Sequence, residues 1–227
     1  NNMGGTAFKM ACTNGYKDIV QLLLCHSDII NLNARDNTGI TAFMTACSNG
    51  QRDVVQLLLD HSKRIDLNAK DTHGLSALMI ACRNGHKDVV QLLLSCSDKN
   101  IDLNARNNMG GTAFKMACTN GYKDIVKLLL CHSDRTNLNA RDNTGITAFM
   151  TACNNGQIDV VKLLLDHSKR IDLNAKDNHG LTALMIASQS GHQDVVQLLL
   201  DHSDIDLNVR DNYGWAAGWA AFMSACK

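Results

Sequence analysis

A pair of glycines recurs along the chain and limits its fold more than any other feature. A turn glycine is followed eleven residues later by a second glycine, as in Gly74 and Gly85. The second glycine returns at intervals of 35, 35, 36, 35 and 35 residues. Repetition at this period is typical of a solenoid, in which stacked units share one continuous core. The turn glycines are Gly4, Gly39, Gly74, Gly110, Gly145, Gly180 and Gly214, and the second glycines are Gly15, Gly50, Gly85, Gly121, Gly156 and Gly191.

The segment 71–94, DTHGLSALMIACRNGHKDVVQLLL, predicts the structure of one unit. Gly74 suits a turn with positive φ, and Ser76 suits the N-cap of a first helix. Gly85 suits the left-handed end of that helix. Asp88 then begins a second helix, where its charge favours the positive end of the dipole. The second helix is so apolar that protein must cover it on more than one side.

The period divides the chain into six full units and one partial unit. We expect a single array with units 1–35, 36–70, 71–106, 107–141, 142–176 and 177–210, and a partial unit 211–227. Residues 107–176 repeat residues 1–70 with six differences: Gln21/Lys127, Ile29/Arg135, Ile30/Thr136, Ser48/Asn154, Arg52/Ile158 and Gln56/Lys162. A three-unit block, 1–106, is therefore duplicated at 107–210. We expect the chain to be part of a longer array and the second Gly-Trp-Ala-Ala, from Gly218, to be an insertion.

The pattern D-x-x-G-x-T-A-x-x-x-A, followed by G-x-x-D-V-V-x-L-L-L and D-L-N-A-K/R, resembles the ankyrin-repeat family over nearly the whole chain. This resemblance implies an all-α solenoid of stacked antiparallel helix pairs with projecting β-turn loops. It also implies binding of partner proteins, although function depends on the sites that a fold carries. It further implies hydroxylation of the loop asparagines, whose expected structural role is local bonding to the turn backbone. These are Asn33, Asn68, Asn104, Asn139, Asn174 and Asn208.

The first helices depart from the family pattern, in which Thr-Pro-Leu-His begins each helix. The chain has no proline, and alanine replaces it at the first helical position. The resemblance implies a histidine that ties adjacent repeats by hydrogen bonds. Lysine or methionine replaces that histidine, and we expect neither to reproduce the ties. These residues are Lys9, Met44, Met79, Lys115, Met150 and Met185.

Charge and cysteine content exclude several classes of function. Lys plus Arg equals Asp plus Glu at 22 each, which gives no long-range attraction to nucleic acid. No apolar run is long enough for membrane insertion. Six of the nine cysteines share one repeat position, too far apart between packed helices for disulfides. We expect Cys12, Cys47, Cys82, Cys118, Cys153 and Cys226 to be buried, reduced thiols in an intracellular, cytoplasmic protein, and Cys25, Cys96 and Cys131 to be more accessible.

The sequence does not predict catalysis, a metal or a cofactor. Asp60-His61-Ser62, Asp166-His167-Ser168 and Asp201-His202-Ser203 contain the residue types of a hydrolase triad. Adjacent residues do not face one another on a helix, so we interpret these segments as helix ends. Paired zinc-ligand spacings and phosphate loops are absent. We therefore expect a protein–protein interaction scaffold and not an enzyme.

Two alternative functions stay open, and both assign the chain to a larger protein. It can be a structural spring or anchoring segment of a membrane or cytoskeletal protein. It can also be the non-catalytic region of an enzyme whose catalytic domain lies elsewhere. The terminal repeats lack a recognisable cap, so end-to-end self-association is a further expectation.

The candidate partner-binding residues lie on the turns and on the concave side of the first helices. In the turns they are Asn37, Thr38, Ile40, Thr72, His73, Leu75, Asn108, Met109, Asn143, Thr144, Ile146, Asn178, His179 and Leu181. In the helices they are Met44, Ser48, Met79, Arg83, Lys115, Thr119, Met150, Asn154, Met185 and Gln189, with Lys9 and Thr13 at the same positions of the first repeat. We expect the methionines to face solvent and to adapt to apolar partners. Ile40, Leu75, Ile146 and Leu181 can instead pack between neighbouring turns.

Overall fold

The computed structural model describes residues 6–26, 28–96 and 100–214. Over these residues the chain forms twelve α-helices, a short 3-10 helix and no named strand. The prediction of an all-α solenoid of stacked helix pairs is confirmed. The fold divides into two compact units, and the boundary lies between Asn108 and Met109. The second Gly-Trp-Ala-Ala segment and the turn around Gly4 lie outside the described residues.

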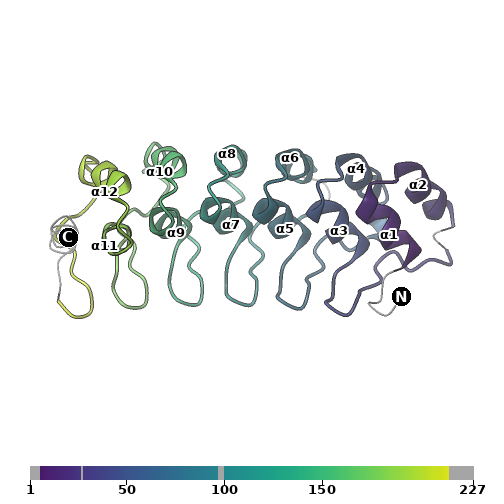
Figure 1. Ribbon diagram of the computed structural model, residues 1–227, viewed down its shortest axis with the longest axis horizontal. Coiled ribbons are helices and arrows are strands. Elements are labelled where there is room, and N and C mark those ends of the chain that lie inside the picture. Colours follow the sequence, from purple (N-terminus) through teal and green to yellow (C-terminus); the bar gives the residue numbers. More distant parts are fainter. Residues whose placement is uncertain (1–5, 27, 97–99, 215–227) are drawn as a thin grey trace. The chain divides into compact units, whose positions relative to one another are not determined.

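Unit 1 stacks three helix pairs (Figure 1). The first helices α1, α3 and α5 pack in sequence as one layer, and the second helices α2, α4 and α6 form the other layer. The connecting turns project away from the second helices. The bounds are α1 Ala7–Asn14, α2 Lys17–Cys25, α3 Ala42–Ser48, α4 Arg52–Asp60, 3-10 helix η1 Ser62–Arg64, α5 Ala77–Asn84 and α6 Lys87–Ser95.

Unit 2 repeats this arrangement with three more pairs (Figure 1). The helix α9 packs between α7 and α11, and α10 packs between α8 and α12. The bounds are α7 Ala113–Thr119, α8 Lys123–Cys131, α9 Ala148–Asn154, α10 Ile158–Leu165, α11 Ala183–Gln189 and α12 Gln193–Leu200.

Local signals in the sequence define the helix ends. The Ser76 hydroxyl accepts a hydrogen bond from the Met79 N–H at 3.4 Å, as predicted for an N-cap. Gly85 ends α5 with φ 79°, in the left-handed region where other residues are strained. Asp88 lies in the first turn of α6, as predicted. The second helices lack side-chain caps, so their stability depends mainly on packing.

The core is filled by small and aliphatic side chains with one phenylalanine or leucine per first helix. In unit 1, Leu58 and Val55 of α4 have no exposed surface, and Phe43 of α3 is 2% exposed. Val54 of α4 is 1% exposed as well, and α4 contacts both α2 and α6. The second helix α4 is therefore covered on both sides, as its apolar circumference predicts. Within the described residues, no helix is both long and apolar enough to cross a membrane.

The loop asparagines differ from the prediction, because their side chains bridge repeats. The Asn33 amide donates to the Arg64 carbonyl at 2.9 Å, and its oxygen accepts from the Asp66 N–H at 2.8 Å. The same pair of bonds forms at Asn68, Asn139 and Asn174. A side-chain amide has one donor and one acceptor side, so it matches one carbonyl and one N–H of the next loop. The asparagines thus join successive loops within each unit.

The predicted burial of the cysteines is confirmed for the described residues. Cys12, Cys47, Cys82, Cys118 and Cys153 are buried free thiols, whereas Cys25 and Cys131 are exposed and Cys96 is half-buried. Burial raises the pKa of Cys12 to about 12, and it also raises the pKa of the buried thiols of Cys47, Cys82 and Cys153. Cys226 lies outside the described residues.

Thiol labelling of the native protein is expected to separate the two sets of cysteines. The thiolate is the reactive form, and burial suppresses both access and ionisation. A maleimide reagent at pH 7 should modify Cys25 and Cys131 before Cys47 and Cys82, as read by peptide mass mapping. Labelling in denaturant supplies the control in which all sites react. Equal native rates at Cys82 and Cys25 would be inconsistent with a buried row of thiols.

Candidate functional site

Each inter-repeat turn is organised by its first residue. The Asp36 carboxylate oxygen Oδ1 accepts from the Thr38 N–H and the Ile40 N–H, both at 2.9 Å. Asp142 makes the equivalent bonds in unit 2, at 2.9 and 3.0 Å. Asp71 and Asp177 hold their turns in the same way. The carboxylate thus replaces missing backbone partners and fixes the shape of the turn.

Backbone hydrogen bonds then join each turn to the next one. The Thr72 N–H donates to the Thr38 carbonyl at 3.0 Å, and the Asn108 N–H donates to the His73 carbonyl at 3.0 Å. In unit 2 the Asn178 N–H donates to the Thr144 carbonyl at 3.0 Å. The turns within a unit therefore form a row whose main chain is already hydrogen-bonded.

Gly74 shows why these turns require glycine. Its φ is 78°, and a Cβ built on it would lie 2.8 Å from the backbone nitrogen of Asn108. Both the backbone conformation and the close approach of the next turn exclude a larger residue. The prediction of a positive-φ turn glycine is confirmed here.

The tips of the turns present exposed side chains. We call these residues the turn edge: Asn37, Thr38, Thr72, His73 and Asn108 in unit 1, and Met109, Asn143, Thr144, Asn178 and His179 in unit 2, all of which are exposed. Met109 is 74% exposed, which is unusual for a large apolar side chain. The turn edge therefore offers both polar and apolar side chains on a main chain that is held in place.

The methionines predicted to face solvent are buried, and that expectation was wrong. Met44, Met79, Met150 and Met185 are at most 1% exposed. In three of them the sulfur Sδ lies 3.4–3.5 Å from the backbone nitrogen of its own N-cap threonine and accepts its hydrogen bond. In these three the side chain folds back over the start of its own helix. These methionines belong to the core and not to a binding surface.

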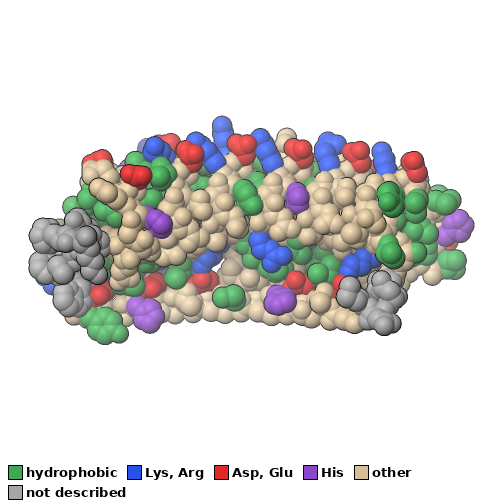
Figure 2. Space-filling model, in the orientation of Figure 1, with side chains coloured by type: hydrophobic (Ala, Val, Ile, Leu, Met, Phe, Trp, Pro, Cys, Tyr) green, Lys and Arg blue, Asp and Glu red, His purple; other side chains and the backbone are tan. Residues whose placement is uncertain are grey.

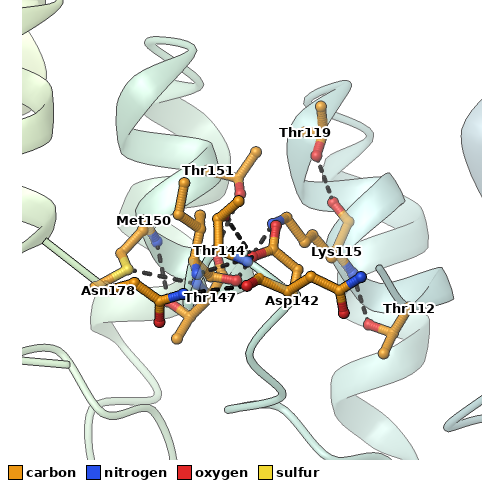
Figure 3. A network of polar contacts seen from close by, with 11 residues as sticks. Thr112, Lys115, Thr119, Asp142, Thr144, Thr147, Met150, Thr151 and Asn178 are labelled. Atoms are coloured by element: carbon orange, nitrogen blue, oxygen red, sulfur yellow. Dashed lines mark hydrogen bonds and ion pairs between the residues drawn. The ribbon is translucent and has the colours of Figure 1, made fainter. Parts of the chain in front are cut away.

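Lysine at the same position makes a bond between repeats, which also corrects the sequence prediction. Lys9 forms an ion pair with Asp36 and donates to the Ile40 carbonyl at 3.4 Å. Lys115 forms the equivalent pair with Asp142 and donates to the Ile146 carbonyl at 3.2 Å. Figure 3 shows Lys115 directed from α7 toward the turn that precedes α9. Lysine thus ties adjacent repeats although the family's histidine is missing.

These contacts change the pKa of the two aspartates. Burial raises the pKa of Asp36, but hydrogen bonds from Lys9, from Thr38 and from the Ile40 N–H outweigh burial and hold the pKa well below its usual range. The same balance lowers the pKa of Asp142. Both side chains are 14% exposed, so solvent screens these interactions only in part.

Acid is expected to weaken the fold through these two carboxylates. In the unfolded chain aspartate has a pKa of about 3.9, and both folded values are lower. The stabilisation is therefore complete above about pH 5 and is lost as the pH falls from about 4 toward the folded values. Asp36→Asn with Asp142→Asn should cost about 1.5–3 kcal/mol per site at pH 7, the range for hydrogen bonds to charged groups.

Urea unfolding at pH 7 and at pH 3.5 measures this effect. The midpoint of the wild type should fall between the two pH values by more than that of the double variant. Asp28→Asn, at a side chain that is 92% exposed, is the control and should change neither midpoint much. An equal fall in wild type and double variant would contradict the assignment.

The ends of the first helices carry the remaining predicted positions. Arg83, Asn154 and Gln189 are exposed, whereas Thr13, Ser48 and Thr119 are half-buried. The backbone carbonyls of Thr13, Thr119 and Asn154 accept bonds from the next repeat. The Ser48 carbonyl does the same, from Asn84 at 2.9 Å and from His86 at 2.7 Å. At these positions the main chain holds neighbouring repeats together, whereas the side chains differ from one repeat to the next.

The apolar turn residues divide into buried and half-buried positions. Leu75 is 5% exposed and belongs to the core. Ile40, Ile146 and Leu181 are half-buried. Burial therefore makes Leu75 inaccessible to a partner, as expected if such residues pack between turns. The other three side chains keep some accessible surface.

The Asp-His-Ser segments do not form hydrogen-bonded relays. The His61 ring nitrogen Nδ1 lies 2.9 Å from the Leu57 carbonyl, one turn back in its own helix. Asp60 accepts from Gln56 at 3.0 Å. His167 and Asp201 make matching bonds within their own repeats. Within the described part of the chain, no group of three or more His, Cys, Asp or Glu side chains could hold a metal ion.

The basic residue that ends the pattern D-L-N-A-K/R lies directly before each turn, and the sequence alone predicted no role for it. We call these the basic rows: Arg35, Lys70 and Arg106 in unit 1, and Arg141, Lys176 and Arg210 in unit 2. All six are exposed. The signal was the recurrence of Lys or Arg at one repeat position, which the zero net charge of the whole chain concealed.

Comparisons with known proteins agree with this architecture. The family model described as ankyrin repeats in three copies matches residues 1–71, 63–142 and 134–211. Among solved structures, the chain is similar to the ankyrin-repeat domain of Bcl-3, described as a unique member of the IkappaB protein family. The two are 27% identical with a TM-score of 0.84, over 96% of this chain and 95% of that one. No curated protein sequence matches the chain.

Proposed function

Because this chain belongs to the ankyrin-repeat family, a protein–protein interaction module, we propose that it is a scaffold that binds partner proteins through its turn edge. The exposed helix ends at Arg83, Asn154 and Gln189 extend this surface. In this proposal the chain itself catalyses no reaction. Partner recognition depends instead on side chains that the repeats hold in place.

One observation carries the proposal most directly: the turn backbone is satisfied while the tip side chains are exposed. The Thr72 and Asn108 N–H groups are bonded to the preceding turns, and the Asp71 carboxylate holds the His73 N–H at 2.9 Å. Thr72 and His73 side chains nevertheless lie at the surface. A partner would not need to order the loops, which lowers the entropic cost of binding.

The opposite side of each unit is a less suitable surface. Basic and acidic side chains alternate over the second helices (Figure 2), with Lys17 beside Asp18 and Arg52 beside Asp53. Mixed exposed charges of this kind favour solvation and contribute little to affinity. We therefore assign partner binding to the turn edge.

Capture of partners by the whole chain tests this function. The chain is immobilised and exposed to a lysate of the cells that encode it, and the retained proteins are identified by mass spectrometry. A tip variant, His73→Ala with Met109→Ala and His179→Ala, should retain specific partners at least threefold less well. The turn bonds use main-chain atoms, so folding should survive, which circular dichroism checks.

A matched control locates the effect. Gln21→Ala, Gln91→Ala and Gln197→Ala remove three exposed side chains from the second helices. This control should retain the partners of the wild type. If the control loses partners and the tip variant keeps them, the turn edge is not the binding surface.

We also propose that the protein works in a reducing, intracellular compartment, as its free thiols suggest. Alkylation of thiols at the moment of lysis tests this. Cys25 and Cys131 recovered as disulfides would argue against it.

A further inference from the structure

The basic rows indicate what kind of partner segment the turn edge would bind. Each unit carries three cations, one per repeat, and all six are exposed. They directly precede the turns, so they lie next to the surface assigned to partner binding. The backbone of Lys70 also forms an isolated antiparallel β-bridge with that of Ser76. This bridge places Lys70 at the base of the projecting turn.

The aspartates that directly follow row residues do not form ion pairs with them. The Asp71 side chain is 6% exposed and accepts from the His73 and Leu75 N–H groups. Asp36 and Asp142 are paired with Lys9 and Lys115. Over residues 6–26, 28–96 and 100–214, no ion pair joins a basic-row side chain to a carboxylate. Within the described residues, the base of the turn edge therefore carries exposed cations that form no ion pair with a carboxylate.

The repeats also fix the positions of the cations. Lys70 donates to the Arg106 carbonyl at 2.9 Å, and Lys176 donates to the Arg210 carbonyl at 2.8 Å. Arg35 donates to the Lys70 carbonyl. The Arg141 guanidinium lies against Gly145, where a Cβ would be 2.9 Å from its nitrogen. Arg35, Lys70 and Lys176 are thus held toward the next row residue. The row positions recur once per repeat, at about the stacking distance of packed helices, 8–10 Å.

This spacing matches one peptide conformation. A polyproline II helix has three residues per turn and rises about 3.1 Å per residue, so residues i, i+3 and i+6 lie on one side about 9 Å apart. A carboxylate at every third residue would therefore meet successive cations of a basic row. Charge pairing of this kind contributes specificity and association rate more than affinity.

We propose that the basic rows bind an extended acidic segment of the partner, with Asp or Glu at every third residue. The inference rests on the proposed function, because it names the chemistry recognised at the same surface. Each unit offers one such site of three cations. Single-stranded nucleic acid is less suited, because its binding also uses successive bases stacked on aromatic side chains, and the turn edge of unit 1 offers a single ring, that of His73.

Binding of synthetic peptides to the whole chain tests the inference by fluorescence anisotropy. The probe is a labelled peptide of three Glu-Pro-Pro repeats. The comparison peptide has the same composition, with its three glutamates adjacent. We expect the spaced peptide to bind about tenfold more tightly at low salt, with two peptides per chain. Added salt should weaken its binding.

Variants of the first row then locate the site. Arg35→Gln, Lys70→Gln and Arg106→Gln together should reduce the stoichiometry from two peptides to one. Lys17→Gln, Arg52→Gln and Lys87→Gln make the same charge change in the same three repeats, on the second helices, and should leave two sites. Urea unfolding confirms that both triple variants fold.

Three outcomes would overturn the inference. The first is equal binding of the two peptides, and the second is equal loss in the two triple variants. The third is tighter binding of oligo(dT) that the row variant abolishes, which would assign the rows to nucleic acid. Partner capture that depends on the tips while the peptides fail to bind would refute only this inference and leave the proposed function standing.

Discussion

Lysine in place of Met79 is expected to unfold unit 1 or to destabilise it by about 3–5 kcal/mol, the cost of leaving a buried charge without a partner. Met79 has no exposed surface. In the repeats that carry lysine at this position, the next turn begins with aspartate, as in Lys9 and Asp36. The turn after Met79 begins with Asn107, which cannot supply a negative charge.

Two further variants make this prediction specific. Met44→Lys should cost less than about 1.5 kcal/mol, because the next turn begins with Asp71. Asn107→Asp should restore most of the stability of Met79→Lys, and the double-mutant cycle isolates the coupling between the two residues. Urea unfolding followed by circular dichroism measures all four proteins. Equal stability of Met44→Lys and Met79→Lys would show that the lysine–aspartate pair does not decide which residue this position accepts.

Alanine in place of Leu58 is expected to cost about 2–5 kcal/mol, the usual range for a fully buried leucine. Leu58 has no exposed surface, and α4 lies between α2 and α6. The cavity should therefore weaken the contacts of the central repeat with both neighbours. Leu22→Ala removes the same atoms from a side chain that is 62% exposed and should cost about 0.5 kcal/mol or less.

Hydrogen exchange followed by mass spectrometry gives the local measurement. Leu58→Ala should increase exchange most in α3 and α4, and less in the neighbouring helices. This pattern follows if the stability of the array is a sum of repeats and their contacts. A larger loss for Leu22→Ala than for Leu58→Ala would contradict the burial of the second helices.

Local chemistry explains how much of the fold could be predicted. The N-cap at Ser76 and the left-handed Gly85 depend on a few neighbouring residues, so the sequence alone located both. The repeat period then implied the stacking of helix pairs, because an apolar helix such as α6 needs cover on two sides. Neither inference required knowledge of contacts between distant residues.

The failures concern side chains that cross from one repeat to the next. Met79 was expected at the surface because the first helices were expected to form the concave side of the array. In the structure Met79 has no exposed surface. Asn33 was expected to bond locally, but its amide spans two loops. Sequence periodicity identifies the face of a helix without showing how far the next repeat covers it.

The basic rows were missed for a different reason. Net charge sums over the whole chain and cannot show that Lys70 is exposed while the adjacent Asp71 is turned into its own loop. Only the structure separates a buried carboxylate from an exposed ammonium group.

Photo-cross-linking from chosen positions tests the assignment of the binding surface most directly. A benzoylphenylalanine residue is placed at His73 or His179 on the turn edge, or at Gln91 or Gln197 on the second helices, and each protein is irradiated with its captured partners. We predict adducts from the two turn positions and none from the two helix positions. Adducts from Gln91 and Gln197, with none from His73 and His179, would contradict partner binding at the turn edge.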